Sequence, residues 1–258
     1  MKQLIIFATG NKGKIREIRD IITDPDTEVL SMKEAGVAAD PDESGATFEE
    51  NALIKARAVA KLVRQKIEDG AFFFDGADGT RSFDTDDIQI TVMSDDSGLV
   101  IDALNGEPGI YSARYLGHDT DYNYKMTQIM KRMENVPDEK RTARFVAAVG
   151  AVFPDGSEHV VLGAMEGVIA RGIFGLNGFG YDPFFYLPEY GKTSAEITEE
   201  EKNAISHRGK ALRAMLSLFD TWKQTGSTAG EADAASRTGN VGNAASKADG
   251  SAACGENK

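Results

Sequence analysis

Two adjacent carboxylates, Asp95 and Asp96, stand between the apolar runs IQITVM (88–93) and GLVID (98–102). Two negative charges at the end of the strand predicted for 88–93 are unfavourable unless a cation offsets them. Mg²⁺ typically takes one or two carboxylates together with phosphate oxygens of a substrate. Glu43, which precedes a predicted helix, is a further candidate ligand. The alternative interpretation of Asp-Asp-Ser-Gly is a turn with Asx capping.

The segment ATGNKGKIREI (8–18) is a candidate phosphate loop, because a tight Gly-Asn turn follows an apolar run and precedes a predicted helix. Asn11 is the expected N-cap of that helix. Backbone N–H groups and the positive end of the helix dipole converge at such a turn and suit a phosphate, and Lys12 and Lys14 add cations. Ile15 stands where a Walker A loop needs Ser or Thr. A plain strand–helix turn remains the alternative.

The loop NGFGYDPFF (177–185) has glycines beside an aromatic residue and a carboxylate. Phe179 on such a flexible loop could stack on a nucleobase, and Asp182 could contact the polar edge of that base. Hydrophobic packing of the loop is the alternative interpretation.

The segment EKNAISHRGKAL (201–212) places Arg208 inside the apolar stripe of a predicted helix. Either the helix breaks near 206–209 or Arg208 points into a lined cavity; a surface His-Arg pair is the alternative. Lys55 and Lys202 are further cations that could accompany the carboxylates.

The elements that must position these residues mix strands and helices without strict alternation, which favours an α/β or mixed α+β fold over a doubly wound sheet. Apolar periodicity and capping residues predict them. The predicted strands are 3–8, 88–93, 98–103, 144–153 and 159–170, and the predicted helices begin after Asn11, after Thr47, near 121 and after Thr198, the last running to about Thr221.

The formal net charge of −12 argues against broad nucleic-acid binding, which needs a basic surface. The single cysteine, Cys254, rules out an intrachain disulfide and a cysteine-based metal site, and suits a reducing cytoplasm. There is no run of 18 apolar residues, and the first residues pass directly into LIIFATGN. We therefore expect a cytoplasmic protein with no membrane span and no secretory signal.

Composition divides the chain into a domain over residues 1–222 and a tail over 223–258. The tail is rich in Ala, Gly, Ser and Asn and offers too little apolar surface to fold, so we expect it to be disordered and dispensable. Within the domain, 69–87 contains six aspartates and one arginine. This pattern predicts an acidic surface insertion peripheral to the chemistry, although three consecutive phenylalanines begin at Phe72.

Five motifs in this order resemble the inosine/xanthosine triphosphate pyrophosphatases: ATGNKGKIREI, ESGATFEENALIKA, SDDSGLVIDALNGEPGIYSARY, FGYDPFF and EEKNAISHRGKAL. The resemblance covers roughly residues 1–220, apart from the insertion. It implies an elongated, two-lobed α/β fold around a long mixed sheet with a central nucleotide cleft, and a homodimer. It also implies Mg²⁺-dependent hydrolysis of free XTP, ITP or dITP to monophosphate and pyrophosphate, with no nucleic acid bound.

The resemblance also implies roles for individual residues. Asp96 corresponds to the base that activates water, and Glu43 and Asp96 to the metal ligands. The positions matching substrate contacts are Thr9, Gly10, Asn11, Lys12, Gly13, Lys14, Lys55, Ser97, Phe179, Gly180, Tyr181, Asp182, Lys202, His207 and Arg208. Several alternatives stay open: Asp95 as the base, Mn²⁺ in place of Mg²⁺, a nucleotide hydrolase that releases phosphate, and a non-catalytic nucleotide sensor. The insertion could also cover the cleft or touch the dimer partner.

Overall fold

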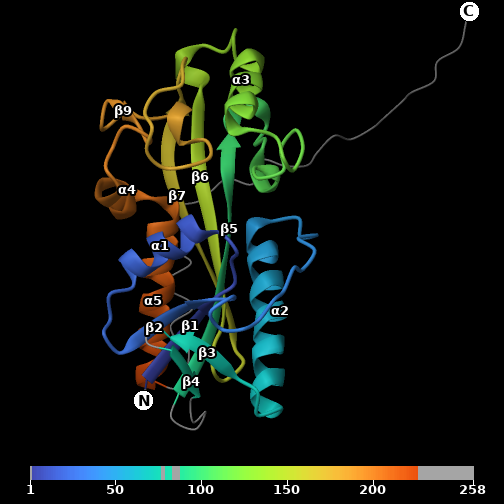
Figure 1. Cartoon of the computed structure of the whole chain (residues 1–258). Helices are drawn as coiled ribbons and strands as arrows, with labels where there is room; N and C mark the ends of the chain where they lie inside the picture. Colours follow the sequence, from blue (N-terminus) through green and yellow to red (C-terminus); the bar gives the residue numbers. More distant parts are fainter. Residues whose placement is uncertain (1, 77–78, 83–87, 226–258) are drawn as a thin grey trace, which may run out of the picture. The chain divides into compact units, whose positions relative to one another are not determined.

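The computed structural model describes residues 2–76, 79–82 and 88–225. The longest strand in these ranges is β5, Ile88–Ile101 (Figure 1). The two apolar runs predicted as separate strands are both parts of β5. Asp95 and Asp96 therefore lie in the middle of a strand, and their predicted place at a strand end is wrong. The polar residues interrupt the apolar pattern but not the backbone pairing, because β5 pairs with β6 from Val92 to Ile101.

Within the described ranges, seven strands form one mixed sheet in the order β2-β1-β5-β6-β7-β8-β9. β1 runs parallel to β2 and β5, whereas every later pair is antiparallel. The predicted mixed sheet is thus confirmed, as is the hairpin around 154–156. The other strands are β1 Lys2–Phe7, β2 Thr27–Ser31, β6 Thr142–Val152, β7 Glu158–Ile169, β8 Phe185–Leu187 and β9 Lys192–Thr193.

The end of β1 creates the place where the polar motifs meet. β1 stops at Phe7, opposite Met93 of β5, and the chain turns away into helix α1, Lys12–Ile21. Beyond Met93, no strand among the described residues pairs with β5 on this side. The backbone edge of β5 is therefore open at Asp95–Gly98, as expected for a ligand site outside the carboxyl end of a parallel strand.

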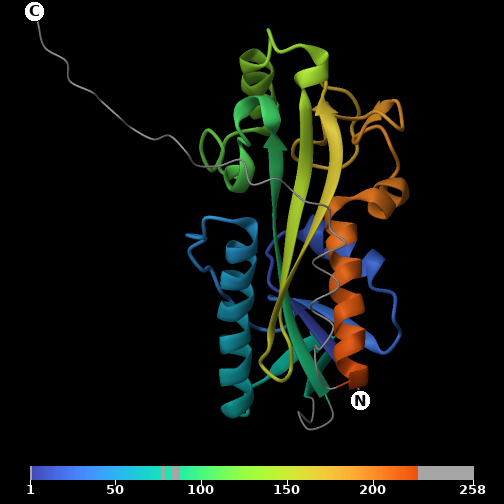
Figure 2. The same ribbon diagram turned by 180° about the vertical axis from the view of Figure 1, so that it is seen from behind.

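Helices cover both faces of the sheet (Figures 1 and 2). On one face α2, Phe48–Glu68, packs its Val59 and Val63 with Val92 of β5. On the other face, α1 and α5, His207–Thr225, share a core with Met93 of β5 and with Ala147, Val149 and Ala151 of β6. Because side chains alternate along a strand, Val92 of β5 faces α2, and Met93 faces α1 and α5.

The far end of the long strands carries a third core, in which α3, Tyr122–Arg132, packs on β5, β6 and β7. Here α4, Glu199–Ile205, begins at a capping box between Thr198 and Glu201, as predicted, and ends before Ser206. The helix breaks at Ser206, as one prediction for 206–209 stated. Arg208 is also buried and lines a cavity, as the other prediction stated. The short 3-10 helices are η2 Asp102–Leu104, η3 Gly109–Tyr111, η4 Asp138–Lys140 and η5 Asp182–Phe184.

The first three residues of the segment 69–87 are exposed, but Phe72 lies in the core, where it is 5% exposed and packs with residues of β1 and α2. It continues as an antiparallel hairpin of β3, Phe73–Gly76, and β4, Gly79–Ser82. Residues 77–78, 83–87 and 226–258 lie outside the described residues, so the acidic surface and the tail stay predictions. No helix in the described part of the chain is long and apolar enough to cross a bilayer.

Close backbone approach at Gly163 of β7 sets where α5 begins. A Cβ added to Gly163 would lie 2.2 Å from the carbonyl oxygen of His207 and 2.7 Å from the nitrogen of Ala211. At Gly150 of β6, where α2 packs, the nearest atom would be the carbonyl carbon of Ala52 at 3.0 Å. Two glycines therefore let helices rest directly on the sheet.

We expect Gly163→Ala to lower the free energy of unfolding by about 1–3 kcal/mol, because α5 must move away from β7. Gly150→Ala should cost less, since its closest contact is longer. Urea denaturation of the two variants and the wild type measures both effects. Equal stability of the Gly163→Ala variant and the wild type would contradict the close packing of α5.

Candidate active site

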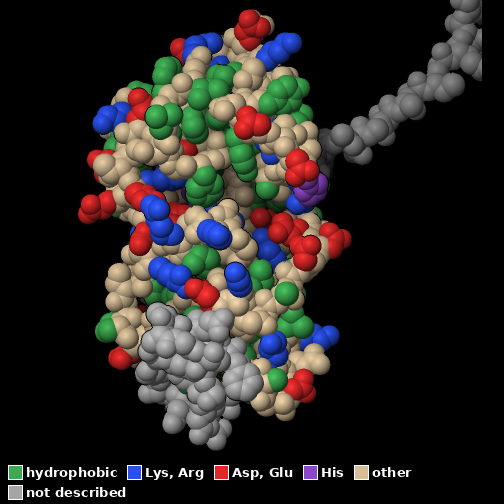
Figure 3. All heavy atoms as spheres, viewed as in Figure 1, with side chains coloured by type: hydrophobic (Ala, Val, Ile, Leu, Met, Phe, Trp, Pro, Cys, Tyr) green, Lys and Arg blue, Asp and Glu red, His purple; other side chains and the backbone are tan. Residues whose placement is uncertain are grey.

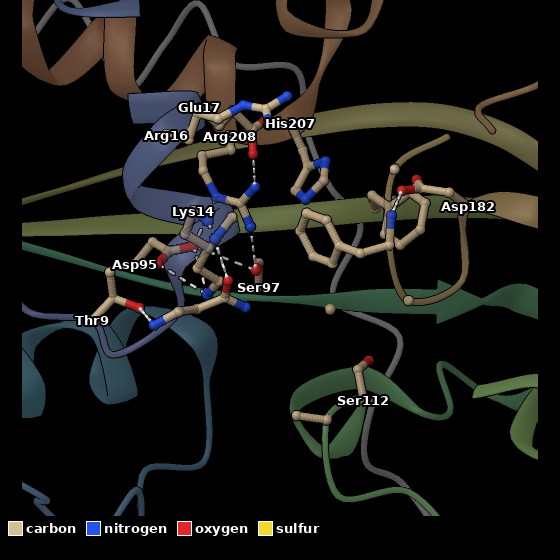
Figure 4. Close-up of a pocket in the computed structure, with 18 of the residues that line it drawn as sticks. Thr9, Lys14, Arg16, Glu17, Asp95, Ser97, Ser112, Asp182, His207 and Arg208 are labelled. Atoms are coloured by element: carbon tan, nitrogen blue, oxygen red, sulfur yellow. Dashed lines mark hydrogen bonds and ion pairs between the residues drawn. The ribbon is translucent and has the colours of Figure 1, made fainter. Parts of the chain in front are cut away.

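Residues from all five sequence motifs line a cavity of about 1110 Å³. Figure 4 labels ten of the lining residues. The walls of the cavity are the loop after β1, the middle of β5, the start of α5 and the loop before η5. Figure 3 shows Lys and Arg side chains gathered across the middle of the face that it draws. The predicted site residues that line the cavity are Thr9, Gly10, Asn11, Gly13, Lys14, Glu43, Lys55, Ser97, Phe179, Gly180, Tyr181, Asp182, Lys202, His207 and Arg208.

Two predicted residues are not part of this lining. Lys12 is the exposed first residue of α1. Asp96 is 7% exposed and faces α2, whereas Asp95 and Ser97 face α1 and α5. Asp95 and Asp96 therefore point to opposite faces of the sheet, because neighbouring residues of a strand alternate.

Asp95 is the centre of a buried ion-pair network. Its carboxylate lies 2.9 Å from Lys14 Nζ and 3.0 Å from Arg208 Nε. Arg208, itself 2% exposed, also donates to Glu17 and, at 3.3 Å, to Ser97 Oγ (Figure 4). Burial alone would raise the pKa of Asp95, but the charges of Lys14 and Arg208 outweigh it and hold that pKa well below its usual range. Asp95 is therefore ionised and fully engaged by cations.

Asp96 has a different environment. Asn51 Nδ2 donates to its Oδ2 at 3.1 Å, the Ser97 N–H donates to its Oδ1 at 3.0 Å, and Lys55 Nζ lies 3.7 Å from Oδ1. Burial and the nearby charge of Glu43 raise the pKa of Asp96, and the charge of Lys55 offsets only part of this rise. A raised pKa suits a carboxylate that must accept a proton.

Lys55 joins Asp96 to Glu43, since its Nζ lies 3.1 Å from Glu43 Oε1. The guanidinium of Arg114 also approaches the Glu43 carboxylate, at 3.7 Å. Among the described residues, no group of three or more His, Cys, Asp or Glu side chains is placed to hold a metal ion. Glu43 and Asp96 thus share the ammonium group of Lys55. A metal ion held by these two carboxylates would need further ligands from outside the protein.

The loop after β1 is ordered by its own side chains. Asn11 Oδ1 accepts from the N–H groups of Gly13 and Lys14, which confirms the predicted N-cap, and Thr9 Oγ1 accepts from the Asn11 N–H. Burial lowers the pKa of Lys14, and the charge of Asp95 offsets part of this effect. A phosphate near Lys14 would favour its charged form.

The loop before η5 holds an exposed aromatic ring over buried charges. Asp182 is 3% exposed and accepts from Lys202 Nζ at 2.6 Å, Ser194 Oγ at 2.6 Å and the Phe179 N–H at 2.8 Å. The carboxylate of Asp182 therefore anchors the loop, and its predicted contact with a base stays a prediction. Phe179 is 46% exposed and has the Lys202 ammonium 5.1 Å from its ring centroid. The Arg208 guanidinium lies 5.7 Å from the same centroid, and the exposed part of the ring can stack on a ligand.

His207 lines the cavity and has one buried ring nitrogen, Nδ1, without a hydrogen-bond partner among the described residues. Its ring stacks on Phe145 at 5.1 Å. Burial, together with the charges of Arg208 and Lys202, lowers the pKa of His207 well below its usual value. The imidazole is therefore neutral at pH 7 and can donate or accept one hydrogen bond to a bound molecule.

Three polar residues of the site were not predicted from the sequence. Glu17 pairs with Arg208, Asn51 with Asp96, and Ser194 with Asp182. Glu17 follows Lys14 by three positions on α1, and Asn51 precedes Lys55 by four on α2, so helical spacing could have indicated both. Ser194 is adjacent to no motif, and only the fold brings it to the loop.

Comparison with known proteins gives one consistent result. The model of the Ham1 family matches residues 5–218. The dITP/XTP pyrophosphatases of Clostridium perfringens and Yersinia pestis are 41% and 42% identical to the chain, in each case over 83% of it and 96% of the relative. The solved structure of the Staphylococcus aureus Ham1 protein is 36% identical, with a TM-score of 0.68 over 84% of this chain and 98% of that one.

The Asp95 network makes stability depend on pH. Replacing Asp95 with Asn leaves Lys14 without its buried counter-charge and Arg208 with Glu17 alone, so we expect the free energy of unfolding near pH 7 to fall by about 3–5 kcal/mol. Because the pKa of Asp95 is depressed in the folded state, its contribution is complete above the unfolded pKa of about 4 and is lost as the pH falls below it.

Urea denaturation at pH 7, 5 and 3 measures this dependence. The stability difference between wild type and Asp95→Asn should be the same at pH 7 and 5 and smaller at pH 3. A difference that is unchanged at pH 3 would show that the lost stability does not come from the ionised carboxylate.

Proposed function

Because the chain belongs to the Ham1 family, we propose that it hydrolyses non-canonical purine nucleoside triphosphates, such as XTP, ITP and dITP, to the monophosphate and pyrophosphate. Removing these nucleotides from the free pool would prevent their incorporation into DNA and RNA. The observation that carries the proposal is the arrangement of the cavity: the loop after β1 and Lys14 line one part of it, and an exposed aromatic ring and a neutral imidazole line another part, beside Lys202 and Arg208.

This arrangement matches the two parts of a nucleotide. Lys14 and Lys55 lie where β1 ends, and the loop from Thr9 to Gly13 leads into the N-terminus of α1, which suits a triphosphate. Phe179 and His207 line another part of the cavity, where a purine can stack and form a hydrogen bond. The negative net charge of the chain does not oppose this, because the cations are concentrated in the cavity.

We propose Mg²⁺ as the cofactor, held by Glu43 and Asp96. Their fit rests on the chemistry of the donors: both offer carboxylate oxygens, and both lie within 4 Å of Lys55 Nζ, a position that already attracts positive charge. Two carboxylates plus phosphate oxygens form a usual Mg²⁺ site. When bound, Mg²⁺ would neutralise charge on the phosphates and lower the pKa of a bound water.

In the proposed reaction, water attacks the α-phosphorus, and the bond from that phosphorus to the α,β-bridging oxygen breaks. Asp96 accepts the proton of the attacking water at Oδ1, on the side that faces Lys55. Lys14 stabilises negative charge on the departing pyrophosphate. Asp95 does not act as the base in this scheme, because Lys14 and Arg208 occupy its carboxylate.

Discrimination against ATP would come from the polar edge of the base. A neutral His207, whose side chain lines the cavity, can donate one hydrogen bond to the 6-oxo group of hypoxanthine or xanthine. Against the 6-amino group of adenine that donor would be left unpaired, which costs binding free energy in a buried site.

We also propose a cytoplasmic homodimer. Support for the dimer comes from large apolar side chains that the described chain leaves in solvent near η3 and α3: Tyr111, Leu116 and Tyr124 are 55%, 51% and 55% exposed. A surface of this kind is typical of an interface. The single cysteine supports the compartment.

A panel of nucleoside triphosphates with separate pyrophosphate and phosphate readouts tests the function. With Mg²⁺ present, kcat/KM for XTP, ITP or dITP should exceed that for ATP by at least about 100-fold, because the polar pocket is mispaired with adenine. Pyrophosphate should be the primary product. Phosphate as the primary product would favour a different nucleotide hydrolase, and binding without turnover would favour a sensor.

The base is tested by Asp96→Asn, which keeps the shape of the side chain but removes its charge. We expect kcat to fall by about 100-fold or more, the scale of a lost acid–base group. Calorimetry with a non-hydrolysable triphosphate should show that binding is affected less than turnover. Near-normal kcat in this variant would assign the proton transfer to another residue.

A further inference from the structure

We propose that Asn51 is a positioning residue that sets the separation of the Glu43 and Asp96 carboxylates and thereby prepares them to hold a divalent cation. The inference rests on the proposed function, in which these two carboxylates act together. It concerns a residue of α2 that lies behind the carboxylates and does not itself line the cavity.

Both ends of the Asn51 amide are used. Its Nδ2 donates to Asp96 Oδ2 at 3.1 Å, and its Oδ1 accepts from the N–H of Gly45 at 2.9 Å. Gly45 lies two residues after Glu43, so one planar side chain connects the loop that carries Glu43 to the strand that carries Asp96. If the amide were flipped, its oxygen would face the carboxylate of Asp96 and its NH₂ group would face the N–H of Gly45. Neither pair could form a hydrogen bond, so these two partners fix the orientation of the amide.

The first turns of α2 hold Asn51 firmly against the sheet. The residue is 0% exposed. The next residue, Ala52, accepts a hydrogen bond from Ser94 Oγ of β5 through its carbonyl oxygen, and its backbone lies over Gly150 of β6. On the other side, a Cβ at Gly45 would lie 2.7 Å from Asn51 Oδ1, so the glycine allows the loop to reach the amide.

The neutrality of the amide matters for the site. Glu43 and Asp96 repel each other, and Lys55 holds them together by occupying the position that a cation would need. Asn51 also holds them, but it adds no positive charge and contacts Asp96 on the oxygen that Lys55 does not approach. Asn51 therefore maintains the spacing of the two carboxylates without itself neutralising either of them. Partners behind metal ligands typically change metal affinity by 10–100-fold when removed.

The test uses two substitutions of Asn51 in the full chain. Asn51→Ala removes both hydrogen bonds. Asn51→Asp is nearly isosteric: it keeps an acceptor for the Gly45 N–H but places a carboxylate against Asp96. Ser94→Ala is the matched control, because it removes the neighbouring contact between β5 and α2 and leaves the amide in place. Circular dichroism establishes which variants fold.

Electron paramagnetic resonance with Mn²⁺ alone measures the cation site without any nucleotide. We expect affinity for Mn²⁺ to fall at least about 10-fold in Asn51→Ala and Asn51→Asp, as in the reference variant Glu43→Gln, and to stay within about twofold in Ser94→Ala. The half-saturating Mg²⁺ concentration for turnover should rise in parallel. KM for the nucleotide at saturating Mg²⁺ should change less than about threefold, because Lys14 and Arg208 lie on the opposite face of β5.

If Asn51→Ala does not fold, Asn51→Asp decides the question. A folded Asn51→Asp protein that binds Mn²⁺ within about twofold of wild type would overturn the proposal, as would a Mn²⁺ affinity that Glu43→Gln leaves unchanged. Because Mn²⁺ binding is recorded without nucleotide, a wrong assignment of substrate or product would leave this result intact. Failure of the proposed function and failure of the role of Asn51 are therefore distinguishable.

Discussion

The alternation of side chains along β5 is the constraint on which the rest of the site depends. Adjacent residues of a strand face opposite sides of the sheet, so Asp95 and Asp96 cannot share one environment. Because β1 ends at Phe7, no described strand covers the edge of β5 at this level, and one cavity reaches residues on both sides of it. A register slip of one residue would exchange the two carboxylates. The pairing of β5 with β6 from Val92 to Ile101 prevents this.

The two carboxylates then contribute in different ways. A buried ion pair such as that of Asp95 with Lys14 and Arg208 adds little net stability, because desolvation of the charges offsets their attraction. What the network does provide is preorganisation: two long cationic side chains are already held in place before an anionic ligand arrives. Asp96 has a raised pKa and a weaker contact with a cation, so it can accept a proton. The separation of structural and reactive carboxylates follows from the strand geometry.

Much of this arrangement could be predicted from the sequence where the determining interactions are local. Asn11, Thr47 and Thr198 each accept a hydrogen bond from a backbone N–H two or three residues later, so the starts of α1, α2 and α4 were predictable. The continuity of β5 was not, because pairing with β6, some fifty positions later, holds its polar centre in the strand. β8 and β9, with three and two residues, carry no periodic signal. The residue types of the site followed from the motifs, but the partners of Asp182 and Asp96 depend on tertiary contacts.

The break at Ser206 shows how a short irregularity completes the site. On one continuous helix, Lys202 and Arg208 would point about 120° apart, since each residue turns the helix by about 100°. Ser206 instead adopts an extended backbone conformation, and its Oγ accepts from the Gly209 N–H, which starts α5 in a new direction. Gly163 allows this new helix to begin directly on β7. Lys202 can then reach Asp182 while Arg208 reaches Asp95, so the two parts of the cavity are joined by one segment of seven residues, 202–208. Two polar residues interrupt the apolar stripe of this segment: Ser206 is needed for the turn, and Arg208 is needed for the ion pair in the cavity.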